Sequence, residues 1–171
     1  TYLFFHGPAK TAKSRALELL YYLCYRAIKN ENASLASIYY LTDKYHPTLL
    51  LDETQKLRRK EHAEVVELLN SGQRLPGVVT RLDKTSRGKL IERMYIVFGF
   101  KALAGIDEFP RTLNSRCIII RMRKAPRRMP KLRYKQALQE TKELRAKLLT
   151  YRLLNLGTPL DQYDDLSLIH I

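Results

Sequence analysis

A lysine and a hydroxyl residue, Lys13-Ser14, follow a loop that opens at Gly7. The apolar residues 2–5 before the loop are typical of a short buried strand, and a helical pattern of apolar residues begins at Ala16. Backbone amides at a helix N-terminus bind phosphate oxygens, a lysine at this place reaches the β- and γ-phosphates, and the hydroxyl coordinates Mg²⁺. This layout predicts a phosphate-binding loop for a nucleotide. The residues of the predicted loop are Gly7, Pro8, Ala9, Lys10, Thr11, Ala12, Lys13, Ser14 and Arg15.

One position departs from the usual pattern Gly-x-x-x-x-Gly-Lys-Ser/Thr. Ala12 stands where the second glycine is expected. A glycine there permits a backbone conformation that a Cβ atom resists. The alternative is a helix cap rich in lysine and serine that binds no ligand, so the loop needs support from the rest of the chain.

That support comes from two adjacent carboxylates, Asp52-Glu53, which directly follow the continuous apolar residues 48–51. Such a run is typical of the centre of a parallel sheet that is covered on both faces. At the tip of such a strand, an aspartate holds Mg²⁺ and a neighbouring glutamate polarises the attacking water. The pair therefore resembles a Walker B motif, and the alternative is two solvated residues that open a loop.

The spacing of the two motifs bears on the class of protein. A helix, a short strand and a second helix fit between Ser14 and Thr48. This favours the additional-strand class of ATPases, which includes AAA+ and helicase motors, over small-molecule kinases.

Apolar periodicity and turn residues predict an alternation of strands and helices along the chain. The expected strands are residues 2–5, 27–29, 48–51, 76–82, 93–98, 101–106 and 117–122. The expected helices are residues 13–26, 34–45 with Ser34 as N-cap, 59–71 and 132–156, with a helical turn at 112–116. The predicted fold is α/β: a three-layer P-loop NTPase core with a mostly parallel central sheet, an inserted β-hairpin and the start of a C-terminal helical lid.

We expect a core over residues 1–125, a basic linker and the start of the lid over 126–160, and a tail without a readable role over 161–171. The chain begins at Thr1 without an initiator methionine, so we expect a fragment of a longer protein.

The polar loop at 83–89 of the expected hairpin is basic. It is either a pore loop of a ring-shaped motor or an ordinary surface hairpin. The basic residues 56–60 are either a solvated face or a contact to DNA or a neighbouring subunit.

The composition and net charge indicate which kind of partner the chain binds. A net charge of +14 and a pI near 9.9 predict an anionic partner, and we expect nucleic acid, or nucleotide plus nucleic acid; the alternative is a basic face that only contacts water. Cys24 and Cys117 lie in apolar runs without metal-ligand spacing, which favours buried thiols in a reducing cytoplasm. The scattered histidines indicate no zinc site, and no apolar run approaches the roughly 18 residues of a membrane span.

Several segments resemble the ATPase domain of helicase/primase-like proteins of phages, plasmids and integrative elements, a family often described only as a domain of unknown function. The matching segments lie between residues 2 and 125. They are Gly7-Pro8, residues 13–18, residues 45–53, residues 69–72, residues 101–106, and Thr112-Leu113 through Arg116 into residues 118–121. The resemblance implies an AAA+-like ATPase in mobile-element DNA replication or maintenance.

In such a motor, Lys13 would stabilise charge on the γ-phosphate of ATP, Ser14 and Asp52 would hold Mg²⁺, and Glu53 would activate water. Arg116, just before the last core strand, would act in trans across the interface of a homo-oligomer such as a hexamer. The alternative is a nucleotide-binding but catalytically weak module that binds nucleic acid. Ala12 favours it, as does the strand at 101–106, which is followed by Asp107 rather than by the sensor Asn or Thr of many AAA+ proteins.

Overall fold

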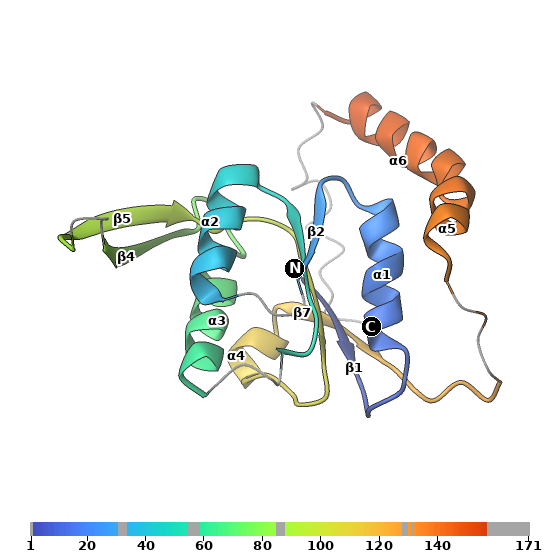
Figure 1. Cartoon of the computed structure of the whole chain (residues 1–171), viewed down its shortest axis with the longest axis horizontal. Coiled ribbons are helices and arrows are strands. Elements are labelled where there is room, and N and C mark those ends of the chain that lie inside the picture. Colours follow the sequence, from blue (N-terminus) through green and yellow to red (C-terminus); the bar gives the residue numbers. More distant parts are fainter. Residues whose placement is uncertain are drawn as a thin grey trace.

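The central sheet brings the two predicted motifs to one edge of the molecule. The computed structural model describes residues 2–30, 34–54, 59–84, 88–127, 130 and 132–156. Within these residues, five parallel strands pair in the order β2-β3-β6-β1-β7 (Figure 1). Their bounds are β1 Tyr2–His6, β2 Ala27–Asn30, β3 Thr48–Leu51, β6 Lys101–Gly105 and β7 Cys117–Arg121.

Helices cover both faces of this sheet. On one face lies α1, Lys13–Leu23, and on the other lie α2, Leu35–Tyr45, α3, Arg59–Ser71, and the short α4, Arg111–Asn114 (Figure 1). Two further helices, α5 Tyr134–Glu140 and α6 Lys142–Leu154, follow on the side of α1 (Figure 1). The result is the predicted three-layer α/β arrangement, and the role of α5 and α6 as the start of a lid stays a prediction.

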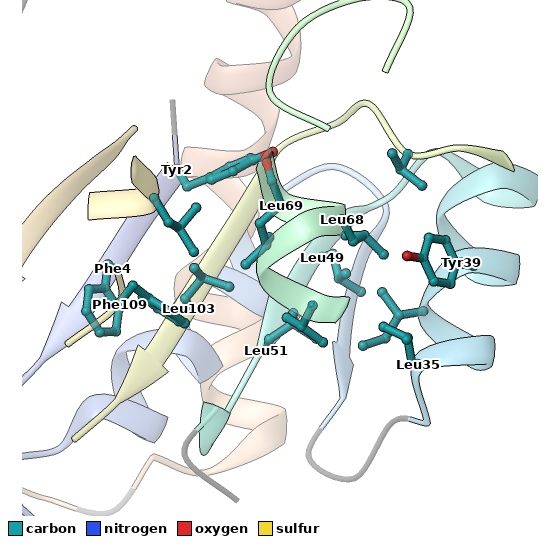
Figure 2. Packing of buried hydrophobic residues seen from close by; sticks show 14 of the residues in the cluster. Tyr2, Phe4, Leu35, Tyr39, Leu49, Leu51, Leu68, Leu69, Leu103 and Phe109 are labelled. Atoms are coloured by element: carbon teal, nitrogen blue, oxygen red, sulfur yellow. Dashed lines mark hydrogen bonds between the residues drawn. The ribbon is translucent and has the colours of Figure 1, made fainter. Parts of the chain in front are cut away.

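The continuous apolar run of β3 is explained by this double cover. Leu49 and Leu51 belong to the core cluster under α2 and α3, whereas Leu50 belongs to the cluster under α1. Figure 2 shows Leu49 and Leu51 beside Leu68 and Leu69 of α3. A strand that buries both of its faces has no place for a polar side chain until it ends, so the first carboxylate follows β3 directly.

A two-stranded antiparallel hairpin lies outside the central sheet. Within the described residues it consists of β4, Val78–Lys84, and β5, Leu90–Ile96, in a register that pairs Val78 with Ile96. It packs on α2 through the rings of Tyr95 and Tyr39, 5.6 Å apart, and through a hydrogen bond from the Ile96 amide to Asp43 Oδ1 of 2.9 Å. The inserted hairpin of the prediction is therefore confirmed.

The strand that lies between the two motif strands in the sheet comes from later in the chain. The short strand predicted between the motifs in sequence is β2, and it lies at the edge of the sheet. The strand that lies between β1 and β3 in space is β6, which comes later in the chain. A sequence order does not reveal this, because crossovers let a later strand pair between two earlier ones.

Most element bounds agree with the prediction, and three differ for identifiable reasons. α1 ends at Leu23 instead of residue 26, because the chain turns through Arg26, whose φ is 49°, into β2. The hairpin strands extend into the predicted loop, since cross-strand pairing continues to Lys84 opposite Leu90. The single helix expected at 132–156 is interrupted at Thr141, whose hydroxyl donates to the carbonyl of Ala137 at 2.6 Å.

Some predictions fall on residues that the structure does not describe. They are most of the basic cluster at 56–60, the centre of the hairpin loop and the tail from residue 157.

Cys24 and Cys117 are half-buried and form no disulfide. Burial raises the pKa of both thiols, that of Cys117 to about 11. In the described part of the chain no helix has the length and apolar character needed to cross a membrane.

A buried lysine connects the sheet to the loop before β6. Lys101 is only 3% exposed, and its ammonium donates to the carbonyls of Val97 at 2.8 Å and Gly99 at 3.1 Å. It also lies 5.2 Å from the ring centroid of Tyr2, whose hydroxyl donates to the carbonyl of Leu69 at 2.8 Å. Burial lowers the pKa of Lys101 to about 8.

This pKa predicts a pH dependence of stability. Between the folded pKa of about 8 and the ordinary value of 10.5, the unfolded chain binds the Lys101 proton and the folded chain releases it, so stability rises with pH in this window. Measured by urea unfolding, the free energy of unfolding of the wild type should rise by about 2 kcal/mol relative to Lys101→Met between pH 7 and pH 10. The exposed Lys142→Met should show no such change, and a flat Lys101 difference would contradict the buried placement.

Candidate phosphate-binding site

A cavity of about 470 Å³ opens at the carboxyl edge of the sheet, where β1, β3 and β6 end. Residues of both predicted motifs line it, although more than thirty positions separate them in sequence. The lining residues are Ala9, Lys10, Thr11, Ala12, Lys13, Ser14, Arg15, Glu18, Lys29, Asp52, Glu53, Ala104 and Ile106. The structure therefore brings the glycine-led loop and the carboxylate pair to one cavity, which we call the phosphate pocket.

The first glycine of the loop lies in a crowded place. Gly7 is buried at the end of β1, and a Cβ atom there would lie 2.4 Å from the carbonyl oxygen of Met122. The backbone on either side is held in place, since the Met122 amide donates to the His6 carbonyl at 2.7 Å. The His6 ring donates from Nε2 to the carbonyl of Ile106 at 2.8 Å. Only glycine lets the chain leave β1 at this point without displacing the segment after β7.

Ala12 adopts the conformation for which the motif normally supplies glycine. Its φ is 64° and its ψ is 23°, in the left-handed region. A left-handed conformation costs an L-residue with a Cβ atom about 1–2 kcal/mol. Ala12 nevertheless starts α1, since its carbonyl accepts the first helical hydrogen bond from the Ala16 amide at 3.1 Å. The alanine thus carries an energetic penalty, and the loop still leads directly into α1.

The ammonium group of Lys13 lies against the loop itself. It donates to the carbonyls of Gly7 at 2.7 Å and Pro8 at 2.6 Å, with Thr11 Oγ1 at 3.4 Å. The buried Thr11 in turn donates to the Pro8 carbonyl at 2.9 Å. These contacts fix a positive charge at the centre of the loop, beside the N-terminus of α1, where the backbone dipole also favours an anion.

The carboxylates come from a strained turn after β3. Asp52 Oδ1 accepts the Glu53 amide at 2.9 Å, and Glu53 has a φ of 50°, which is rare for a residue other than glycine. The next residue, Thr54, is buried and donates to the Ala104 carbonyl of β6 at 3.4 Å. The turn therefore holds both carboxylates half-buried at the mouth of the pocket, and strained backbone of this kind concentrates at functional sites.

The pocket is also lined by two charged residues that sequence reasoning did not single out. Glu18 lies one helical turn after Ser14 on α1, and Lys29 belongs to β2. The spacing from Ser14 to Glu18 is a sequence signal that could have been used, because side chains four apart share a helix face. Lys29 could not have been found, because its inclusion depends on β2 pairing beside β3.

The donor set fits a magnesium ion that is held partly by phosphate. No group of three or more His, Cys, Asp or Glu side chains in the described ranges could hold a metal ion alone. Mg²⁺ is commonly bound by one or two protein ligands together with waters and substrate phosphates. The Ser14 hydroxyl and the Asp52 carboxylate, which line the same pocket, match that pattern.

Arg116 does not join the other predicted residues within its own chain. It precedes β7 at the amino edge of the sheet, where its carbonyl accepts the Tyr2 amide at 3.0 Å. Its guanidinium donates to the side-chain amide oxygen of Asn70. The phosphate pocket lies at the opposite edge, so any role of Arg116 there requires a second copy of the chain.

In the comparisons with known proteins, matches occur among solved structures. No protein-family model matches the sequence, and no curated protein matches it. Among solved structures, the JC virus (JCV) helicase with a bound thiazolopyridinyl phenoxyphenyl acetamide matches 90% of this chain at 18% identity and a TM-score of 0.45. The match spans 41% of that helicase chain. Similarity at this level is too low to carry a function to this chain, so the resemblance to mobile-element proteins stays a prediction.

The left-handed conformation of Ala12 leads to a test of the loop. Ala12→Gly should raise the free energy of unfolding by about 1 kcal/mol, because it removes the left-handed strain. Ala9→Gly is the matched control: Ala9 lies in the same loop without a positive φ, so glycine there should lower stability by about 0.5 kcal/mol. Equal effects of the two substitutions in urea unfolding would contradict the loop geometry.

Proposed function

We propose that this chain binds ATP with Mg²⁺ and hydrolyses it as the motor domain of a helicase or translocase. The observation that carries the proposal is the shared phosphate pocket, in which the loop containing Lys13 and Ser14 faces the carboxylates of Asp52 and Glu53. Phosphoryl transfer depends chiefly on positioning and charge stabilisation, and this pocket offers groups of both signs for those tasks.

Each side chain has a distinct task in this proposal. The ammonium of Lys13, now on the loop carbonyls, would bind a phosphate oxygen as negative charge moves onto the leaving group. Glu53 would orient the attacking water and accept its proton. The Ser14 hydroxyl and the Asp52 carboxylate would hold Mg²⁺, which when bound polarises the phosphoryl oxygens. Water then attacks the γ-phosphorus, the bond to the β-phosphate oxygen breaks, and ADP and inorganic phosphate leave.

The broader role rests on charge. A net charge of +14 supports a nucleic-acid partner, and we propose DNA within the replication or maintenance of a mobile element. We further propose a homo-oligomer, such as a hexamer, in which Arg116 of one subunit completes the pocket of its neighbour. The proposed location is the cytoplasm.

A second function is favoured by one specific feature of the pocket. Among the described residues at the ends of β3 and β6, no amide side chain is present that could sense the γ-phosphate. Apart from Thr54, these residues supply carboxylates and the apolar Ala104 and Ile106. Together with the strained Ala12, this supports a module that binds nucleotide, turns it over weakly and acts by binding nucleic acid. ATP binding without measurable turnover in the wild type, together with turnover in Ala12→Gly, would favour this module.

Substitutions in the pocket test the motor. Lys13→Ala and Glu53→Gln should each lower the ATPase rate at least about 100-fold, because each removes a group that acts on the transferred phosphoryl or its nucleophile. Exposed residues of the same types, Lys142→Ala and Glu67→Gln, serve as controls and should keep the wild-type rate. A coupled phosphate-release assay with single-stranded DNA measures the rate, and wild-type activity in the pocket variants would refute the assignment.

Mixing two inactive variants tests the proposed role of Arg116. Arg116→Ala keeps an intact pocket but lacks the arginine, and Lys13→Ala has a disabled pocket but keeps the arginine. If Arg116 acts across an interface, an equal mixture should recover about a quarter of the wild-type ATPase rate. Half of the subunits have an intact pocket, and random pairing gives half of these a neighbour that keeps the arginine. Asn70→Ala controls for loss of the internal hydrogen bond, and a mixture as inactive as its components would exclude action in trans.

A further inference from the structure

A second cavity, of about 690 Å³, lies at the amino edge of the sheet, opposite the phosphate pocket. Its walls come from the α1–β2 turn, the α2–β3 turn, the segment between β5 and β6, and the end of α6. The lining residues are Tyr25, Arg26, His46, Pro47, Thr48, Phe98, Gly99, Phe100, Tyr151, Arg152, Asn155 and Leu156. We call it the aromatic cleft.

Aromatic rings dominate the cleft, and several of them face solvent. Phe100 is 64% exposed, Tyr151 is 61% exposed and Tyr25 is 52% exposed. Large aromatic side chains are usually covered, because each buries a large apolar surface. Three such rings in one cavity form a surface on which a flat ring could stack.

Cations accompany the rings, and no carboxylate is present among the described lining residues. The Arg152 guanidinium lies 4.3 Å from the centroid of the Tyr25 ring, and that of Arg26 lies 5.2 Å from it. His46 adds a group that carries a positive charge when protonated. A cleft of this composition attracts an anion and repels a basic peptide.

Hydrogen bonds hold the walls of the cleft in place. Thr48 Oγ1 donates to the Tyr25 carbonyl at 3.1 Å, and the Leu49 amide donates to the Phe100 carbonyl at 3.0 Å. At the end of α6, Asn155 Nδ2 donates to the Tyr151 carbonyl at 2.7 Å. Because these bonds fix the backbone beside the rings, a ligand would not have to order the cleft before binding.

From these observations we propose that the aromatic cleft binds unpaired nucleobases of a single-stranded nucleic acid. Bases stack on aromatic rings and on arginine guanidinium planes, and the neighbouring phosphates pair with cations. The cleft supplies both kinds of group in one cavity, in a chain with a net charge of +14. The proposal extends the proposed function by locating a nucleic-acid site, but it does not depend on ATP binding.

Binding of fluorescein-labelled oligothymidylate and oligouridylate of about 20 nucleotides, measured by anisotropy without nucleotide, tests the proposal. Phe100→Ala and Tyr25→Ala should each weaken binding at least about fivefold, and Phe100→Leu should also weaken it, because it keeps an apolar side chain but loses the ring. Tyr40→Ala is the matched control, since Tyr40 is an exposed ring on α2 with the ammonium of Lys44 5.2 Å from its centroid.

Salt dependence separates stacking from charge. Arg152→Ala should lower the slope of log affinity against log salt concentration by about one, whereas Phe100→Ala should leave the slope unchanged. Arg74→Ala, an exposed arginine outside the cleft, is the control for a general loss of charge. Photocrosslinking of a 4-thiothymidine oligonucleotide should place adducts on residues of the cleft.

The outcomes are distinct from those that concern the phosphate pocket. Lys13→Ala should bind the oligonucleotides like the wild type, so loss of ATPase activity leaves this proposal standing. Wild-type affinity in folded Phe100→Leu and Arg152→Ala would overturn it, as would crosslinks confined to the β4–β5 hairpin. Loss of self-association at unchanged oligonucleotide affinity would instead identify the cleft as a subunit interface and also overturn the proposal.

Discussion

Burial of β6 on both faces is the constraint on which the rest of the structure depends. All of its residues, from Lys101 to Gly105, are buried, and it pairs with β1 on one side and with β3 on the other. Neighbouring strands lie about 4.8 Å apart, so this one interposed strand separates the ends of β1 and β3 by about 10 Å. That gap leaves room for a phosphate group and a metal ion between the loop and the carboxylates. Direct pairing of β1 with β3 would close it.

The elements that could be predicted from sequence are those with a local cause. The bounds of β3 and α3 agree with their apolar patterns, and Ser34 caps α2 as expected, since its hydroxyl oxygen accepts the Ser37 amide at 3.2 Å. The two motif segments could be singled out because glycine-led loops and paired carboxylates have their own spacing, and the structure brings both to one cavity. The break at Thr141 depends on a side-chain hydrogen bond that competes with the helix, and propensity alone does not reveal it.

What could not be predicted depends on which segments meet. Lys29 lines the phosphate pocket because β2 pairs beside β3, and Arg116 lies away from that pocket because it enters β7 from the other edge of the sheet. The aromatic cleft combines four segments that lie far apart in the sequence. Its rings are scattered in sequence between Tyr25 and Tyr151, so only the topology brings them together.

The shortness of β3 has a mechanical consequence. It has four residues and is about 13 Å long, and it runs from Thr48 in the aromatic cleft to the turn that carries Asp52 in the phosphate pocket. Packed cores have low compressibility and transmit strain, so a strand packed on both faces keeps a fixed distance between its two ends. The position of Thr48 therefore constrains the position of the turn that carries the carboxylates. The short strand β3 thus directly connects the aromatic cleft at one end of the sheet with the phosphate pocket at the other.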